Sequence, residues 1–235
     1  CIDDFVEVEH DESLQFNDTI KIEAKIKLES NEGNQFIVMK GDYGWGLYVR
    51  DGFLAFANDY SLSKHEISNM SLPLDTWVDV AVEVNTTIGL FFVNHTPSGN
   101  FDTNNLTIPD GNFGSNYCFE NSLSCDELII GKMGASCDCN YFKGMLDDIS
   151  ISSYDIQDED WNVVTIWNFD EGKGNLTYDQ DLRAGTIHGA HWVMPDGSLV
   201  GQAIRLENDE SYVLDTNINT KYLFFVELPN NTAHL

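Results

Sequence analysis

The sequence predicts an all-β protein, an antiparallel jelly-roll β-sandwich. Three observations support this fold class. Apolar and polar residues alternate with a period of two through many short segments, turn-forming residues separate these segments, and no convincing amphipathic helix is present. At 235 residues the chain is long enough for one large β domain, or for one domain and part of another.

The alternation is clearest in residues 19–29 (TIKIEAKIKLE) and 77–84 (WVDVAVEV), which are typical of half-exposed antiparallel strands. Residues 46–57 predict two strands joined by Asp51-Gly52, a dipeptide that suits a two-residue hairpin turn. Further strands are expected at residues 4–9, 35–40, 89–94, 127–132, 141–152, 163–169, 186–194, 202–207, 212–215 and 222–228. A short helical turn is expected at 154–162, where three acidic residues suit a first turn, and residues 95–126 are expected to form a long irregular stretch.

The composition places strong negative charge on the surface. Lys and Arg number 12 and Asp and Glu number 39, so the formal net charge is −27. Such a surface repels phosphate backbones, which makes nucleic acid a poor partner and divalent cations good ones. No apolar run approaches the length that spans a bilayer, so no transmembrane segment is expected.

Two features favour an extracellular or cell-surface location. Asn-x-Ser/Thr sequons occur more often than the roughly three that chance predicts, although Asn- and Thr-rich β turns are an alternative source of them. They stand at Asn17, Asn69, Asn85, Asn94, Asn105, Asn175 and Asn230. The five cysteines, four of them clustered, predict disulfides rather than a zinc site, because C-x₂-C spacing is absent. They are Cys1, Cys118, Cys125, Cys137 and Cys139.

A series of segments resembles the laminin-G-like, concanavalin A-like jelly-roll family in order along the chain. These segments are DDFVEVEHDESLQF, IKIEAKIKL, IVMKGD, GWGLYV, LPLDTWVDVAVEV, GLFFVN, IIGKM and YFKGMLDDISI, and the resemblance covers residues 3–152. A second resemblance follows, because IWNFDEGKGN and residues 188–215 are similar to the opening of another such domain. The expected organisation is a laminin-G-like jelly roll at 1–155, a linker at 156–165, and leading strands of a second repeat at 166–235.

The second segment leaves two arrangements open. Its strands either pack on the sheets of the same sandwich, or they cover a neighbouring copy of the chain and so support filament assembly by strand exchange. The first arrangement keeps a closed monomer.

The family resemblance also implies a calcium site. Asp147 and Asp148 stand where the family has an acidic pair, and Asp3 and Asp4 are expected beside them because the first and last strands tend to be neighbours. Asp42, in the KGD turn, is a further candidate ligand. The alternative is that this pair only shapes a strand twist, with one carboxylate in solvent or bonded to backbone N–H groups.

Other constellations bear on sugar chemistry. Tyr43, Trp45 and Tyr60 lie on or beside the first hairpin and could stack on sugar rings, unless Trp45 fills the core instead. No E-x-D-x-x-E run of the kind that glycosidases of this fold carry is present, so no enzyme activity is expected. His188 and His191 are expected to pack structurally rather than to bind metal.

The sequence therefore favours a noncatalytic, glycosylated extracellular module that acts in adhesion or as a filament or surface-appendage subunit assembling through its C-terminal strands. Its partners would be other copies of itself or extracellular proteins and glycans. The alternative is a carbohydrate-binding, lectin-like module of a larger glycan-processing protein.

Overall fold

The computed structural model describes residues 4–14, 16, 19–41, 44–57, 65–103, 127–134, 139–155, 160–194 and 202–206. Its strands are β1 (Phe5–Val8), β2 (Ile20–Leu28), β3 (Asn34–Lys40), β4 (Gly46–Arg50), β5 (Phe53–Ala57), β6 (His65–Ser71), β7 (Trp77–Val84), β8 (Ile88–Val93), β9 (Thr96–Asp102), β10 (Leu128–Ile130), β11 (Gly144–Asp155), β12 (Asp160–Trp167), β13 (Leu176–Tyr178), β14 (Ala184–His188), β15 (His191–Val193) and β16 (Ala203–Leu206). One 3-10 turn, η1 (Glu12–Leu14), follows β1.

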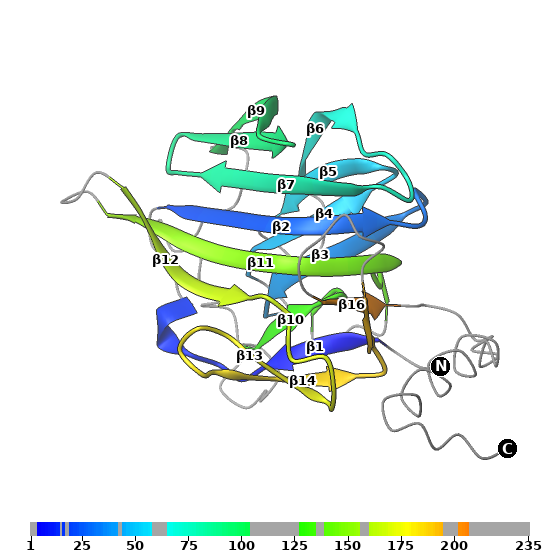
Figure 1. Cartoon of the computed structure of the whole chain (residues 1–235). Coiled ribbons are helices and arrows are strands. Elements are labelled where there is room, and N and C mark those ends of the chain that lie inside the picture. The colour runs from blue at the N-terminus through cyan, green and yellow to red at the C-terminus, as the bar shows by residue number, and fades with distance from the viewer. Residues whose placement is uncertain are drawn as a thin grey trace, which may run out of the picture.

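These strands form two antiparallel sheets that face each other as a sandwich, which confirms the predicted jelly-roll class. The first sheet has the order β13-β14-β1-β10-β3-β4-β5-β6. The second has the order β15-β16-β11-β2-β7-β8-β9, and β12 also pairs with β11. Figure 1 looks onto the second sheet, with β7, β2 and β11 running side by side across it.

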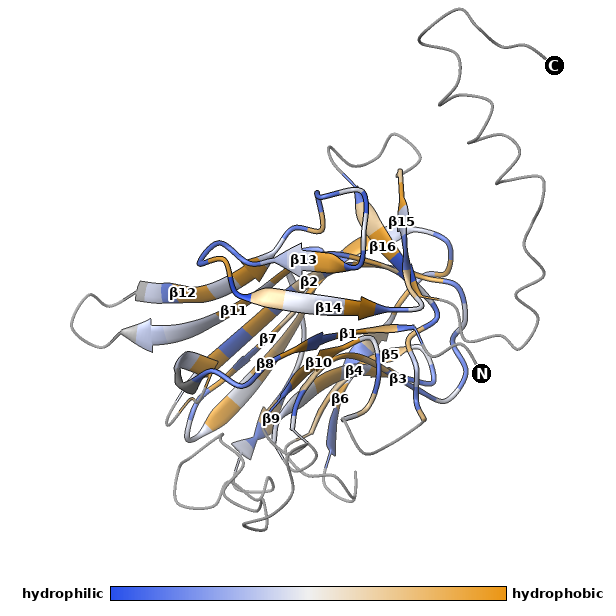
Figure 2. Ribbon diagram, turned by 90° about the horizontal axis from the view of Figure 1, so that it is seen from below, coloured by the Kyte–Doolittle hydropathy of each residue, from blue (hydrophilic) through white to orange (hydrophobic). Residues whose placement is uncertain are grey.

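The core lies between the sheets and follows from the alternating pattern. In β2 every second residue, from Ile20 to Leu28, is buried, while the residues between them are partly exposed. Each buried Ile or Leu side chain among them stabilises the fold by about 1.5–3 kcal/mol relative to exposure. The strands of both sheets carry the hydrophobic segments seen in Figure 2. The predicted hairpin is also present, because Asp51 and Gly52 adopt positive φ angles of 48° and 83° between β4 and β5.

Part of the segment expected to be irregular, 95–126, is a strand. Asn94 and His95, with φ angles of 47° and 60°, form a tight turn that leads the chain back along β8 as β9. Strand β9 contains Pro97 and Gly99, residues that disfavour central strands but are tolerated at a sheet edge. Strand β6, which is largely exposed and ends the first sheet, also has too weak an alternation to predict.

The helical turn expected at 154–162 is wrong at both ends that the structure describes. Strand β11 continues to residue 155, and β12 begins at residue 160 and pairs with it. The expected linker 156–165 therefore contains the first six residues of β12. The acidic run favoured a helix start, but the aromatic and β-branched residues around it pair across two strands, and this tertiary pairing prevails over local propensity.

The single strand expected at 186–194 is two strands in different sheets. Gly189, with a φ angle of 70°, turns the chain between β14 in the first sheet and β15 in the second. Strands β13 to β16 all belong to the same two sheets as β1 to β11. For these four strands the structure thus shows the arrangement in which the C-terminal strands complete the same sandwich. The strands expected at 212–215 and 222–228 lie outside the described residues.

Within the part of the chain that the structure describes, no helix is long and apolar enough to cross a membrane.

Candidate functional site

The adjacent carboxylates Asp147 and Asp148 form a β-bulge in β11. Between Asp147 and Ser150 the chain of β11 advances three residues while its partner β2 advances two, from Lys25 to Glu23. The extra residue keeps both Leu146 and Ile149 in the core, although their odd spacing would otherwise put them on opposite faces. At this bulge the other neighbour of β11 changes from β16 to β12.

The bulge separates the environments of the two carboxylates. Asp148 adopts a φ angle of 47° and forms an ion pair with Lys25 at 3.0 Å, while its backbone N–H donates to Asp147 Oδ1 at 2.9 Å. Asp147 is 2% exposed. Burial, followed by repulsion from Asp148, raises the pKa of Asp147 from 3.8 to about 7. This geometry matches the structural alternative, in which one carboxylate accepts a backbone bond and the other faces solvent.

The expected adjacency of Asp4 and the acidic pair is not found. Asp4 precedes β1 in the first sheet, whereas Asp147 and Asp148 lie on β11 in the second. Across the described residues, no group of three or more His, Cys, Asp and Glu side chains is placed to hold a metal ion. Asp3 and Asp42 lie outside those residues, so calcium binding stays a prediction.

The aromatic side chains near the first hairpin do not form a described surface. Trp45 is fully buried and packs edge-on against Phe16, with ring centroids 6.1 Å apart. The prediction that Trp45 contacts a sugar is therefore wrong, because a side chain without exposed surface cannot stack on a ligand. Tyr43 and Tyr60 lie outside the described residues.

The predicted modification sites are only partly described. Asn69, Asn94 and Asn175 are exposed and Asn85 is half-buried, whereas Asn17, Asn105 and Asn230 lie outside the described residues. Cys139 is disulfide-bonded. The pairing stays a prediction, because Cys1, Cys118, Cys125 and Cys137 also lie outside the described residues.

A depression of about 440 Å³ runs beside β1 and β14, and its charged groups bond one another. His188 stacks on Phe5, with centroids 4.4 Å apart, and contacts Glu7 at 3.1 Å. Arg183 contacts Asp11 at 3.6 Å. His188 and His191 lie on strands of different sheets, β14 and β15.

The outer face of the second sheet offers a different kind of surface. Here the outward residues of β2 meet those of β7, so that Lys21 lies opposite Glu83 and Lys25 opposite Asp79. Lys21 contacts both Glu23 at 3.0 Å and Glu83 at 3.4 Å. Burial acts to lower the pKa of Lys21, but the bonds and charges of these two glutamates outweigh it and the net shift is upward.

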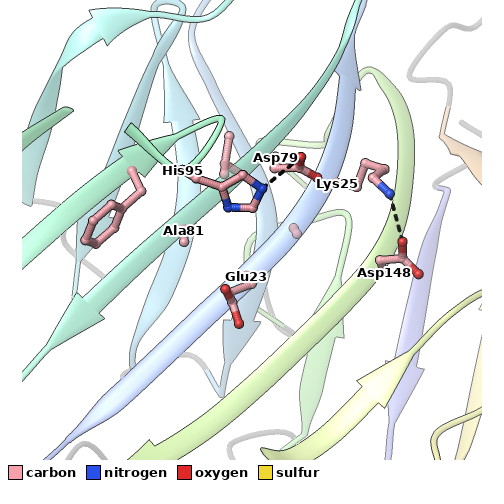
Figure 3. Close-up of a pocket in the computed structure, with 9 residues that line it drawn as sticks. Glu23, Lys25, Asp79, Ala81, His95 and Asp148 are labelled. Atoms are coloured by element: carbon pink, nitrogen blue, oxygen red, sulfur yellow. Dashed lines mark hydrogen bonds and ion pairs between the residues drawn. The ribbon is translucent and has the colours of Figure 1, made fainter. Parts of the chain in front are cut away.

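One end of this face holds a shallow charged pocket of about 90 Å³ (Figure 3). Figure 3 shows Lys25 reaching Asp148 and His95 reaching Asp79, the latter at 3.6 Å. The charged groups of this pocket are thus largely paired, and little apolar surface lines it.

The other end holds a groove of about 190 Å³, which we call the aromatic groove. It is lined by Thr19, Glu83, Val84, Asn85, Ile88, Leu90, Tyr154 and Trp161. Tyr154 and Trp161 are register partners on the β11–β12 hairpin, and their rings meet edge to face at 5.6 Å and 73°. The backbone N–H of Tyr154 donates to Thr19 Oγ1 at 3.0 Å, which ties this hairpin to the start of β2.

Sequence reasoning missed Tyr154 and Trp161 because both fall in the expected helical turn at 154–162. A usable signal was present: Ser150, Ser152 and Tyr154 continue the outward positions of β11 after the bulge, and Trp161 begins a β-branched run. Read as a hairpin, these residues place two aromatic rings on the polar side of the sheet.

Comparisons with known proteins show the fold. No protein-family model matches the sequence, and no curated protein matches it. Among solved structures, a candidate carbohydrate-binding protein from Bacteroides ovatus superposes with a TM-score of 0.60 at 14% identity, over 88% of this chain and 58% of that one. The chain thus spans less than two thirds of that protein.

Two further structures are less similar. A SAP-like pentraxin from Limulus polyphemus gives a TM-score of 0.40 at 14% identity, over 64% of this chain and 76% of that one. The CBM40 module of a Ruminococcus gnavus sialidase, bound to α2,3-sialyllactose, gives a TM-score of 0.40 at 14% identity, over 59% of this chain and 82% of that one. The protein is accordingly an antiparallel jelly-roll sandwich, a fold that it shares with the Bacteroides ovatus structure.

Proposed function

We propose that the protein is a noncatalytic carbohydrate-binding module whose ligand lies in the aromatic groove. The observation that carries this proposal is the pair of rings, Tyr154 and Trp161, held edge to face over an open groove. Tyrosine and tryptophan offer an apolar ring face together with a polar group, which suits the mixed surface of a sugar. Polar side chains at the rim, such as Thr19 and Glu83, can bond sugar hydroxyls.

The charges around the groove favour a neutral sugar. The ammonium of Lys21 lies 5.9 Å from the centroid of the Trp161 ring. It already contacts Glu23 and Glu83, so its charge is balanced within the protein. With a formal net charge of −27, the chain as a whole repels acidic ligands.

The carboxylates near the groove support a noncatalytic role. A glycosidase needs one carboxyl as proton donor and a second as nucleophile or base, both facing the scissile bond. Glu23 and Glu83 both form ion pairs with the same ammonium, that of Lys21. Asp147 is buried within the sheet and is not at the groove.

The fold adds general support, because the Bacteroides ovatus structure shares this sandwich and carries a carbohydrate-binding description. At 14% identity it shows the fold alone, so the ligand class rests on the groove.

The test is a glycan array followed by calorimetric titration, on protein produced without glycosylation. We expect binding to neutral oligosaccharides in preference to sialylated ones. Trp161→Ala should weaken binding by about 2 kcal/mol, or roughly 30-fold, as expected for a central aromatic contact.

Tyr178→Ala is the matched control, because Tyr178 is 42% exposed but lies on β13 in the other sheet. It should leave affinity unchanged. Equal losses in both variants, or no glycan binding by the folded wild type, would contradict the proposal.

The other expected properties remain proposals. An extracellular location, glycosylation, adhesion, assembly into filaments, calcium binding and the specific laminin-G relationship rest on the sequence. Assembly was expected through the C-terminal strands of 166–235, and the part of this segment after residue 206 lies outside the described residues. Truncation after residue 206 tests assembly through the tail. Loss of ordered polymers in the truncated protein would support such assembly, and a monomer unchanged by truncation would not support it.

A further inference from the structure

The Asn85 sequon lies at the edge of the aromatic groove. Asn85, Thr86 and Thr87 form the turn between β7 and β8, and Asn85 lines the groove together with Tyr154 and Trp161. The atom that carries an N-linked glycan is the side-chain nitrogen Nδ2. The direction of that nitrogen therefore decides where an attached sugar begins.

Hydrogen bonds fix this direction. Asn85 Oδ1 accepts from the backbone N–H of Thr87 at 2.8 Å, from Thr87 Oγ1 at 2.9 Å and from the backbone N–H of Ile88 at 2.8 Å. Two of these donors are backbone N–H groups, so the oxygen rather than the nitrogen of the amide must face the turn. Because the two atoms of a planar amide point apart, Nδ2 is directed away from the turn.

We propose that an N-linked glycan on Asn85 occupies the aromatic groove and closes it to other ligands. This inference rests on the proposed function, because it assigns the groove to sugar. The first N-acetylglucosamine would start at the groove rim, beside the apolar side chains of Ile88 and Leu90 and within reach of the paired rings. Protein glycosylated at Asn85 would thus have a closed aromatic groove, and protein without this glycan would have an open one.

Tethering explains why even a weak contact suffices. A group held by a short flexible link has an effective concentration on the order of millimolar. If the groove binds a single sugar with a dissociation constant of about 100 µM, the tethered sugar lowers the apparent affinity for a free ligand roughly tenfold.

Two of the other described sequons provide internal comparisons. Asn175 is exposed and lies just before β13, in the first sheet, and Asn69 is exposed on β6 at the far edge of that sheet. Neither lines the aromatic groove. A glycan at either position starts on a different part of the sandwich.

The decisive variant is Thr87→Ala, which abolishes the sequon but keeps Asn85 and both backbone bonds to its Oδ1. Asn175→Gln is the matched control that removes a glycan elsewhere. Both are made with wild type in a eukaryotic secretory host. Mass spectrometry of glycopeptides then gives the occupancy of each site, and an unoccupied Asn85 in secreted wild type would overturn the proposal.

Two measurements complete the test. Nuclear Overhauser contacts between the Asn85-linked N-acetylglucosamine and the Trp161 ring are expected in glycosylated wild type, and this readout needs no external ligand. Thr87→Ala should bind neutral oligosaccharides about tenfold more tightly than wild type, while Asn175→Gln should not differ from it.

If the Overhauser contacts are absent and Thr87→Ala binds sugar with the same affinity as wild type, the closed form is refuted. Carbohydrate binding by the aromatic groove would remain unaffected by this result. If unglycosylated protein binds no glycan but the contacts are present, the proposed function fails and the self-occupied groove remains.

Discussion

Replacing Asp147 by Asn tests how the bulge in β11 shapes the stability of the protein. The pKa of Asp147 rises from 3.8 to about 7 in the folded state, so between these values the folded chain holds a proton that the unfolded chain has lost. Stability is therefore greatest below the lower value and falls as the pH rises towards 7. Above pH 7 the Asp147 carboxyl is ionised in both the folded and the unfolded chain, so the free energy of folding includes the full cost of burying the charge.

The magnitude follows from the shift. About three pH units, from 3.8 to about 7, correspond to on the order of 4 kcal/mol of unfolding free energy at 1.36 kcal/mol per unit. Asn has the same shape and no charge, and its side-chain oxygen can still accept the N–H bond of Asp148. Asp147→Asn should therefore be more stable than wild type at pH 8, and the two should converge as the pH falls to 4.

The assay is urea unfolding of both proteins at intervals from pH 4 to 8, in buffer containing a chelator, with the difference in free energy plotted against pH. Asp148→Asn is the control, because Asp148 is half-exposed and paired with Lys25. That variant should show no comparable gain at pH 8. A difference between wild type and Asp147→Asn that does not change with pH would refute the reasoning.

Two further predictions concern the ion pairs and the expected metal. Arg183→Ala should cost about 3–5 kcal/mol of stability in chemical unfolding, because Arg183 Nε contacts the buried Asp179 carboxylate at 2.6 Å and its loss leaves that charge with neutral donors only; a loss below 1 kcal/mol would show that these donors, the Thr165 hydroxyl and the backbone N–H groups of Asp181 and residue 183, suffice. Calcium in excess over a chelator should raise the thermal midpoint of wild type if Asp147 and Asp148 hold the ion, and the rise should vanish in Asp148→Asn; no shift would remove the calcium prediction.

Alternation predicts strands well where one face is buried and the other exposed, as in β2 and β7. It fails for β6 and β9, which lie at sheet edges and bury too little to enforce a pattern, and for the start of β12, where an acidic run suggested a helix. At Asp147 the sequence suggested a metal site or a strand twist, and the structure shows a bulge, because only an inserted residue reconciles Leu146 and Ile149 with one core.

The candidate site was harder to predict than the fold. A single sequence does not show whether an aromatic side chain on a strand faces the core or solvent unless its register is known. For Trp45 the sequence left sugar contact and core packing open, and the structure buries it, whereas Trp161 was overlooked and lines the groove. Their positions depend on pairing with distant strands, which no local pattern encodes.

The most direct measurement of the central claim is an NMR titration of unglycosylated protein with a neutral oligosaccharide, following the indole N–H of Trp161. Sugar bound in the aromatic groove should shift this signal and the backbone signals of Thr19 and Tyr154 together, with one dissociation constant. Signals that stay fixed at saturating sugar, or that shift only along β1 and β14, would contradict the assignment of the groove.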